Sequence, residues 1–393
     1  MFRWVKIRST AIFNWFTRTT VYVKIATVLA ALSFANAESI KYFQPQTILL
    51  QPHSTQAYQV DMNDAISESN SLFKVSAKDA TPIYFYREVF TPVCFDNKCR
   101  PLTINLFWNI TGRYLGFELP EGEFLSKTDH DPFSVDEYEK LNQILATERT
   151  PLADINYNQL TVESNSHGLG DIDAISAATP QNLAPYVIDG AAYTTFKLWH
   201  LIHGTTRNQV QKLTIQDISP ELILKILESP VQADKIWALE HIDGHVGFTS
   251  DLKEKVFDLI KGENYLIVEK ALSAIHKTEL DSLNVQQLLM KALIQENYNV
   301  QIRVIDKIGE CNALKESVKM HLVENLGSLN GQVFKKALTV LAEQELTAEM
   351  YFKIAVFLKS ENAFISNSIA AFLKSEHITD PQILALLKKN GNE

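Results

Sequence analysis

The C-terminal half of this 393-residue chain repeats an apolar pattern at a nearly fixed interval. A small or branched residue recurs after 33, 33, 33 and then 32 residues, at Ala238, Ala271, Val304, Ala337 and Ile369. In each unit the next residue is apolar, and so is the residue three positions after that one. Such an interval is typical of paired helices that stack in series, because one pair alone cannot bury its apolar face.

The rest of each unit agrees with this interpretation. No convincing strand pattern occurs after about residue 206, and an asparagine that suits a helix N-cap lies seven residues before the recurring position in four units, at Asn264, Asn297, Asn330 and Asn362. The pattern resembles HEAT or armadillo-type repeats of somewhat reduced length, and it lacks the Thr-Pro-Leu-His signature of ankyrin. A plain helical bundle would not need five units in phase. The resemblance implies an all-α HEAT-like solenoid of helical hairpins over residues 205–393, with a surface that binds a partner or holds another module.

The N-terminus has the layout of an export signal. Its first 37 residues contain five basic and no acidic residues, an apolar run over residues 25–34, and Ala35-Asn36-Ala37 before Glu38. This layout predicts a signal peptide over residues 1–37. The alternative is an uncleaved anchor, but the apolar run is shorter than the ~20 residues of a membrane helix. We therefore expect a periplasmic or extracellular protein, with membrane association only through an uncleaved N-terminus.

The charge of the mature chain limits its partners. Without the five cations of the signal, 32 Lys and Arg stand against 46 Asp and Glu, a net charge of −14. An acidic surface of this size argues against nucleic acid as a partner.

Residues 38–204 have a mixed pattern that predicts an α+β domain. Strand-like runs cover residues 40–50, 83–94, 102–110 and 113–119. Ser134 and Glu137 form a capping box that predicts a helix start, and a second helix is expected from about Tyr186 to His203, with Gly204 as its C-terminal stop.

Two of the three cysteines lie on either side of an expected turn. Cys94 and Cys99 enclose Phe95-Asp96-Asn97-Lys98, and an Asp-Asn pair favours a tight turn between strands. In an oxidising compartment this arrangement predicts a disulfide. A redox-active or metal-binding pair is the alternative, although the spacing is not that of C-x-x-C. Cys311 is interpreted as a small apolar residue near a helix end.

One short segment points to a cofactor. Residues 173–179 read D-A-I-S-A-A-T, which resembles the D-x-x-S/T-G-A-T motif of the FMN-binding domain in sodium-pumping quinone oxidoreductases and related electron-transport complexes. The weaker resemblance around it extends over residues 80–204 and includes the Thr111-Gly112-Arg113 turn and the Gly190-Ala191-Ala192-Tyr193 helix start. Ala177 stands where the family has glycine, and Pro180 directly follows the threonine.

The resemblance implies FMN attached through its phosphate to the hydroxyl of Thr179 by a separate flavin transferase. Ser176 and backbone N–H groups near Ala177 and Ala178 would bind phosphate oxygens, and Asp173 would help the transferase recognise the site. Tyr193, Phe196 or Trp199 would supply an aromatic slot for the flavin ring, although core packing explains them equally well. A relative of the same fold without the flavin is the alternative.

Other candidate sites have simpler explanations. His200 with His203 and His241 with His245 have helical spacing but lack the Glu of an H-E-x-x-H zinc site. Asp129-His130-Asp131 is explained by a polar loop as well as by a metal site, and Asn109-Ile110-Thr111 is a glycosylation triplet only in a eukaryotic cell. With no nucleophile elbow, P-loop or dinucleotide motif, we expect a non-enzymatic electron carrier that docks a redox protein through its repeats. The alternative is a cofactor-free binding or scaffold protein, and a hydrolytic or metal-dependent enzyme is a weaker third.

Overall fold

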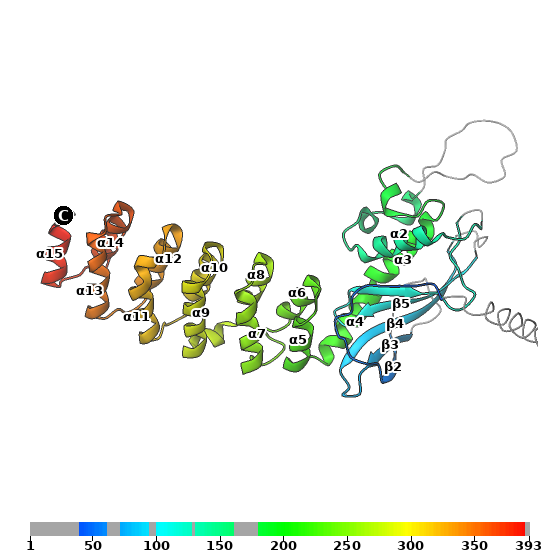
Figure 1. The fold of residues 1–393 in the computed structure, drawn as a ribbon, viewed down its shortest axis with the longest axis horizontal. Coiled ribbons are helices and arrows are strands. Elements are labelled where there is room, and N and C mark those ends of the chain that lie inside the picture. Colours follow the sequence, from blue (N-terminus) through cyan, green and yellow to red (C-terminus); the bar gives the residue numbers. More distant parts are fainter. Residues whose placement is uncertain (1–38, 61–70, 94–99, 128–129, 161–179, 390–393) are drawn as a thin grey trace, which may run out of the picture.

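The computed structural model describes residues 39–60, 71–93, 100–127, 130–160 and 180–389. In these residues a domain with an antiparallel sheet is followed by a long series of helices (Figure 1). The expected succession of an α+β domain and a helical domain is therefore confirmed. The expected signal peptide and the pair Cys94 and Cys99 lie outside the described residues, so both stay predictions.

The sheet has six antiparallel strands in the order β1-β6-β5-β4-β3-β2. Its strands are β1 (Lys41–Phe43), β2 (Ser54–Gln59), β3 (Ser71–Ser76), β4 (Pro82–Thr91), β5 (Leu102–Asn109) and β6 (Tyr114–Glu118). The three runs expected between residues 83 and 119 correspond to β4, β5 and β6. The expected strand at 40–50 was too long, because only its start pairs with β6, and β2 and β3 were not predicted.

One face of the sheet forms the core of this domain. Alternate residues of β4, among them Ile83, Phe85 and Val89, are buried on the side that carries the helices. Trp108 on β5 is also buried there, and its indole N–H donates to the carbonyl of Ile202 at 2.9 Å. The other face carries a row of aromatic rings, in which Tyr86 stacks on Phe73 with ring centroids 4.7 Å apart.

Three helices cover the buried face: α2 (Val135–Ala146), α3 (Ala192–His203) and α4 (Thr205–Gln216). The predicted capping box at the start of α2 is confirmed, because the Ser134 and Glu137 side chains each accept from the other's backbone N–H. The prediction for α3 was wrong at its start, which lies six residues later than Tyr186. Gly190 has a φ of +70° in the turn before the helix, a left-handed conformation that an α-helix cannot include. Gly204 is the C-cap, as expected.

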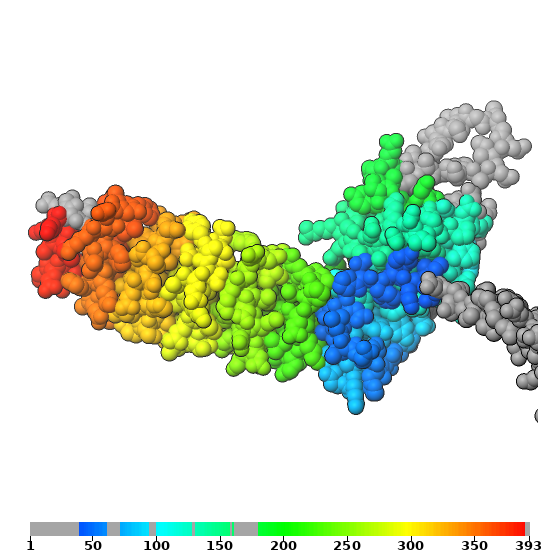
Figure 2. Space-filling view, viewed as in Figure 1, coloured from blue at the N-terminus to red at the C-terminus, as the bar shows by residue number. Residues whose placement is uncertain are grey.

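The remaining helices form an elongated array that projects from the sheet domain (Figures 1 and 2). They are α5 (Pro220–Leu227), α6 (Gln232–Glu240), α7 (Ser250–Ile260), α8 (Tyr265–Ser273), α9 (Leu283–Gln295), α10 (Tyr298–Gly309), α11 (Glu316–Asn325), α12 (Gly331–Ala342), α13 (Ala348–Val356), α14 (Ala363–Ser375) and α15 (Pro381–Lys389). Short 3₁₀ turns occur at Pro151–Asp154, Tyr157–Gln159, Ala184–Tyr186, Lys277–Asp281, Leu326–Ser328 and Phe357–Lys359.

The periodic residues of the sequence line the contacts within this array. The even-numbered helices from α6 to α14 contact one another in order, and the odd-numbered helices lie beside them in a second row (Figure 1). All five recurring small or branched residues, from Ala238 to Ile369, are 0% exposed. The recurring position of the repeat therefore belongs to the buried core of every unit. Cys311, just after α10, is buried as expected, and burial raises the pKa of its thiol to about 11.

Three of the four expected asparagine caps are complete. The side-chain oxygens of Asn264, Asn297 and Asn362 accept hydrogen bonds from backbone N–H groups in the first turns of α8, α10 and α14. Asn330 occupies the N-cap position of α12 without such a bond. In the part of the chain that the structure describes, no helix has both the length and the apolar character needed to cross a bilayer.

Candidate functional site

The expected cofactor residues Asp173, Ser176, Ala177, Ala178 and Thr179 lie outside the described residues. The structure describes the chain on either side of them, up to Leu160 and from Pro180 onward. Leu160 is buried in the core of the sheet domain. The carbonyl of Pro180 accepts from the backbone N–H groups of Leu183 and Ala184, so a tight turn begins directly after the predicted attachment residue.

An aromatic cluster lies beside these flanks. Tyr193 stacks on Tyr157 with ring centroids 4.5 Å apart, and Phe196 packs edge-on against Tyr157 at 5.9 Å. Tyr157 and Tyr193 are half-buried, and the hydroxyl of Tyr157 donates to the carbonyl of Val93 at 2.6 Å. Tyr157 was missed by the sequence analysis, because it lies in a short 3₁₀ turn and joins Tyr193 only through the fold.

The other two expected flavin contacts belong to the core. Phe196 is 9% exposed and Trp199 is 5% exposed. The indole N–H of Trp199 donates to the carbonyl of Thr147 at 3.0 Å. Of the three aromatic residues proposed for the flavin slot, only Tyr193 is therefore not buried.

Three of the four paired histidines pack against the rest of the fold. The Nε2 atoms of His200 and His203 lie 3.0 and 2.9 Å from the carbonyls of Leu152 and Leu145. Burial lowers the pKa of both imidazoles. His241 stacks on Trp237 at 4.0 Å, and His245 is exposed. Among the described residues, no three His, Cys, Asp or Glu side chains are placed to hold a metal ion.

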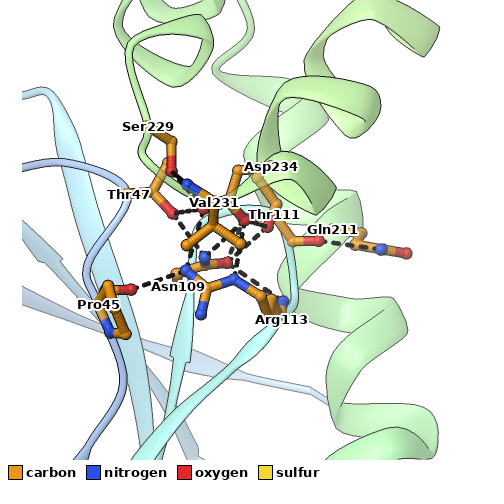
Figure 3. A network of polar contacts seen from close by, with 9 residues as sticks. All are labelled: Pro45, Thr47, Asn109, Thr111, Arg113, Gln211, Ser229, Val231 and Asp234. Atoms are coloured by element: carbon orange, nitrogen blue, oxygen red, sulfur yellow. Dashed lines mark hydrogen bonds and ion pairs between the residues drawn. The ribbon is translucent and has the colours of Figure 1, made fainter. Parts of the chain in front are cut away.

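The densest polar site joins the sheet domain to the array. Asp234, in the first turn of α6, is completely buried and accepts six hydrogen bonds from side chains of two domains (Figure 3). Its Oδ1 accepts from Asn109 (3.0 Å), Thr111 (2.9 Å) and Arg113 Nε (3.0 Å), and its Oδ2 from Thr47 (2.8 Å), Ser229 (2.7 Å) and Arg113 Nη2 (3.0 Å). We call these six residues the Asp234 cluster.

The turn between β5 and β6 presents most of these donors. Asn109 Oδ1 accepts from the backbone N–H groups of Thr111 and Arg113, which holds the turn in shape. Gly112 has a φ of +82°, and a Cβ atom there would come within 2.8 Å of the Gln211 side chain on α4. Glycine is therefore required for both the backbone conformation and the packing of α4 against the turn.

The electrostatics of the Asp234 cluster favour the charged carboxylate. Burial alone would raise the pKa of Asp234, but the hydrogen bonds and positive charge of Arg113 outweigh burial, and the pKa is lowered. Both carboxylate oxygens are saturated with donors and the side chain is shielded from water. The cluster is therefore a joint that fixes the array to the sheet, and it leaves no room for a substrate. Since Asn109 belongs to this joint and is fully buried, it cannot carry a glycan in the folded chain.

The repeat itself contains a signal for this joint. In the 33-residue register, Asp234 corresponds to Ile267, Val300 and Val333, and with the final 32-residue step to Ile365. A charged residue at a position that is apolar in every later unit marks a special contact, and this signal was missed.

Comparisons with known proteins do not identify a family for this chain. No family model, curated protein or solved structure matches this chain.

Proposed function

We propose that this protein is an exported electron carrier that holds FMN covalently on Thr179. We further propose that its helical array is a HEAT-like solenoid that docks the carrier to a redox partner. The carrier needs no turnover chemistry of its own, because bound FMN would supply reversible electron transfer. The observation that carries the proposal is the D-A-I-S-A-A-T segment in a chain with an export-type N-terminus.

An aromatic pair formed by described residues before and after the segment suits a flavin in part. Pro180 follows Thr179 directly, and Tyr157 lies four residues before residue 161, where the undescribed segment begins. The Tyr157 and Tyr193 rings stack on each other and are half-buried, and in this proposal they form the aromatic side of the flavin site. Phe196 and Trp199 do not fit this role because they are packed in the core.

Two features support a docking role for the array. Its helices form an elongated surface, which suits a large protein partner better than a small molecule (Figure 2). The Asp234 cluster fixes the first helical pair to the sheet domain, so a partner held by the array would be held at a defined place relative to that domain.

The intact mass of the mature protein tests the flavin. The protein is purified from cells that also express a flavin transferase, with Thr179→Ala as the control. We expect one FMN phosphoester on the native chain, with a flavin absorption spectrum, and neither in the variant. An unmodified mass from cells that flavinylate a positive-control protein would refute the carrier function.

A cofactor-free binding protein is the second candidate. Burial of Phe196 and Trp199 removes two of the three proposed ring contacts, and Ala177 replaces the glycine of the family motif. In this case the array alone carries the function, and the Thr179→Ala variant would bind the array's partner as well as the native protein does.

A further inference from the structure

A second periodic feature lies on the surface of the array. A glutamate and an asparagine cap directly precede three of its even-numbered helices, and an exposed aromatic ring lies in the first turn of each. The three rungs are Glu263-Asn264-Tyr265, Glu296-Asn297-Tyr298, and Glu361-Asn362 with Phe364. The rings of Tyr265, Tyr298 and Phe364 are 43%, 41% and 47% exposed. We call these residues the acidic-aromatic ladder.

The ladder has one gap. The unit before Phe364 has Leu329, Asn330 and Gly331 at the same positions, so it lacks both the acid and the ring. Gly331 lies next to Tyr298, whose hydroxyl would be 4.0 Å from a Cβ atom built there. Rungs therefore occur at the starts of α8, α10 and α14, along one edge of the even-numbered row (Figure 1).

The acids of the ladder differ from three acids of the array that join neighbouring units. Glu240 pairs with Lys270, Asp306 with Lys336, and Glu324 with Lys353, in each case between neighbouring units. Within the described residues, Glu263, Glu296 and Glu361 take part in no ion pair. Their charges are therefore available to a ligand, whereas the paired charges hold the units together.

The aromatic rings complement a cation. The guanidinium of Arg303 lies over the Tyr265 ring at 5.2 Å and also donates to its hydroxyl, so this ring already attracts a cation of the chain itself. On the first rung, Glu263 is therefore the group that is left for a ligand. A carboxylate beside an exposed ring is a suitable site for a lysine or arginine side chain. Next to the first rung, Glu263 and Asp258 line a hollow of about 380 Å³ that also contains Lys235.

We propose that the acidic-aromatic ladder binds an extended, basic segment of a partner protein, with one Lys or Arg side chain on each rung. Neighbouring helices pack about 8–10 Å apart, and an extended chain rises about 3.3 Å per residue. The first two rungs, on neighbouring helices, therefore match cationic residues about three positions apart. The third rung lies two helices farther along the row and matches a cationic residue about six positions later. This proposal rests on the docking role proposed for the array, but it does not depend on the flavin.

Binding of a short synthetic peptide tests the ladder. The probe is a fluorescent peptide with lysine at every third position, titrated by anisotropy with the full mature chain at low ionic strength. The triple variant Glu263→Gln, Glu296→Gln and Glu361→Gln should bind about threefold more weakly per rung, or roughly thirty-fold in total. Thr179→Ala should bind like the native chain, which separates this result from the fate of the flavin.

The matched control removes the same charge from the paired acids, as Glu240→Gln, Asp306→Asn and Glu324→Gln. Far-UV circular dichroism and thermal melts of both triple variants confirm that the array remains folded. The proposal predicts native affinity in this control and loss only in the ladder variant. Equal loss of affinity in both variants would overturn the proposal, because binding would then depend only on the net charge of the protein. Absence of binding to the native chain at low salt would also overturn it.

Discussion

The first helical pair of the array and the pairs that follow differ at one buried position. Ile267, Val300 and Val333 are buried in the apolar core, whereas the corresponding Asp234 contacts the sheet domain through five hydrogen bonds and accepts a sixth from Ser229. The same place in the repeat therefore serves two interfaces of different chemistry. An apolar residue suits a neighbour with the same pattern, and a carboxylate suits a turn that presents polar donors.

The largest effect is expected when the charge is moved to a unit that lacks donors. Val333→Asp places a carboxylate at a fully buried position of α12. We expect a loss of more than about 4 kcal/mol in the free energy of unfolding, or local unfolding of that unit, because a buried charge without partners is rarely tolerated. Urea denaturation followed by circular dichroism measures the effect.

Val333→Ala is the control for this change, since it creates a cavity without adding a charge. We expect about 1–3 kcal/mol from the cavity alone. If the free energy of unfolding falls by the same amount in both variants, electrostatics does not explain why a carboxylate occurs at this position only in the first unit.

Removing the carboxylate from the joint should have the next largest effect. Asp234→Ala removes the carboxylate that accepts from Arg113 and from four buried polar side chains, so we expect a loss of about 3–5 kcal/mol. Denaturant titration measures the loss, with Asp217→Ala as the control. Asp217 is 39% exposed and pairs with Lys74, and its removal should cost less than about 1 kcal/mol. A loss below about 1 kcal/mol for Asp234→Ala would show that the joint is held by other contacts.

The charge of Asp234 also predicts a dependence on pH. Its pKa is lowered in the folded protein, so its contribution to stability is fully present above the unfolded pKa of about 3.9 and is lost as the pH falls through the folded value. The difference in unfolding free energy between the native chain and Asp234→Asn should be constant from about pH 7 to pH 5 and shrink below about pH 4. A difference that is independent of pH down to full acid unfolding would contradict the lowered pKa.

The two domains also differ in how much of them the sequence predicts. Helix pairs, buried small residues and caps follow from local periodicity, because each unit contacts mainly its neighbours. The edge strand β2 was not predicted, since Ser54–Gln59 is polar and its pairing with β3 depends on residues farther along the chain. Members of the Asp234 cluster are separated by up to 187 positions, and no local pattern joins them. The predicted flavin residues lie outside the described chain and stay a prediction.

The asparagine caps give the smallest and most direct comparison between units. Asn297→Ala removes a side chain that accepts from the N–H groups of Asn299 and Val300 at 3.1 and 3.3 Å. We expect a loss of about 1 kcal/mol in the free energy of unfolding. Asn330→Ala is the matched variant at the N-cap of α12, where the side chain makes no capping bond, and it should lose only a few tenths of that amount. Hydrogen exchange at the first turns of α10 and α12 would locate the two effects. Equal losses would mean that the asparagine is retained at this position for its backbone conformation, because both residues lie in the extended region before the helix.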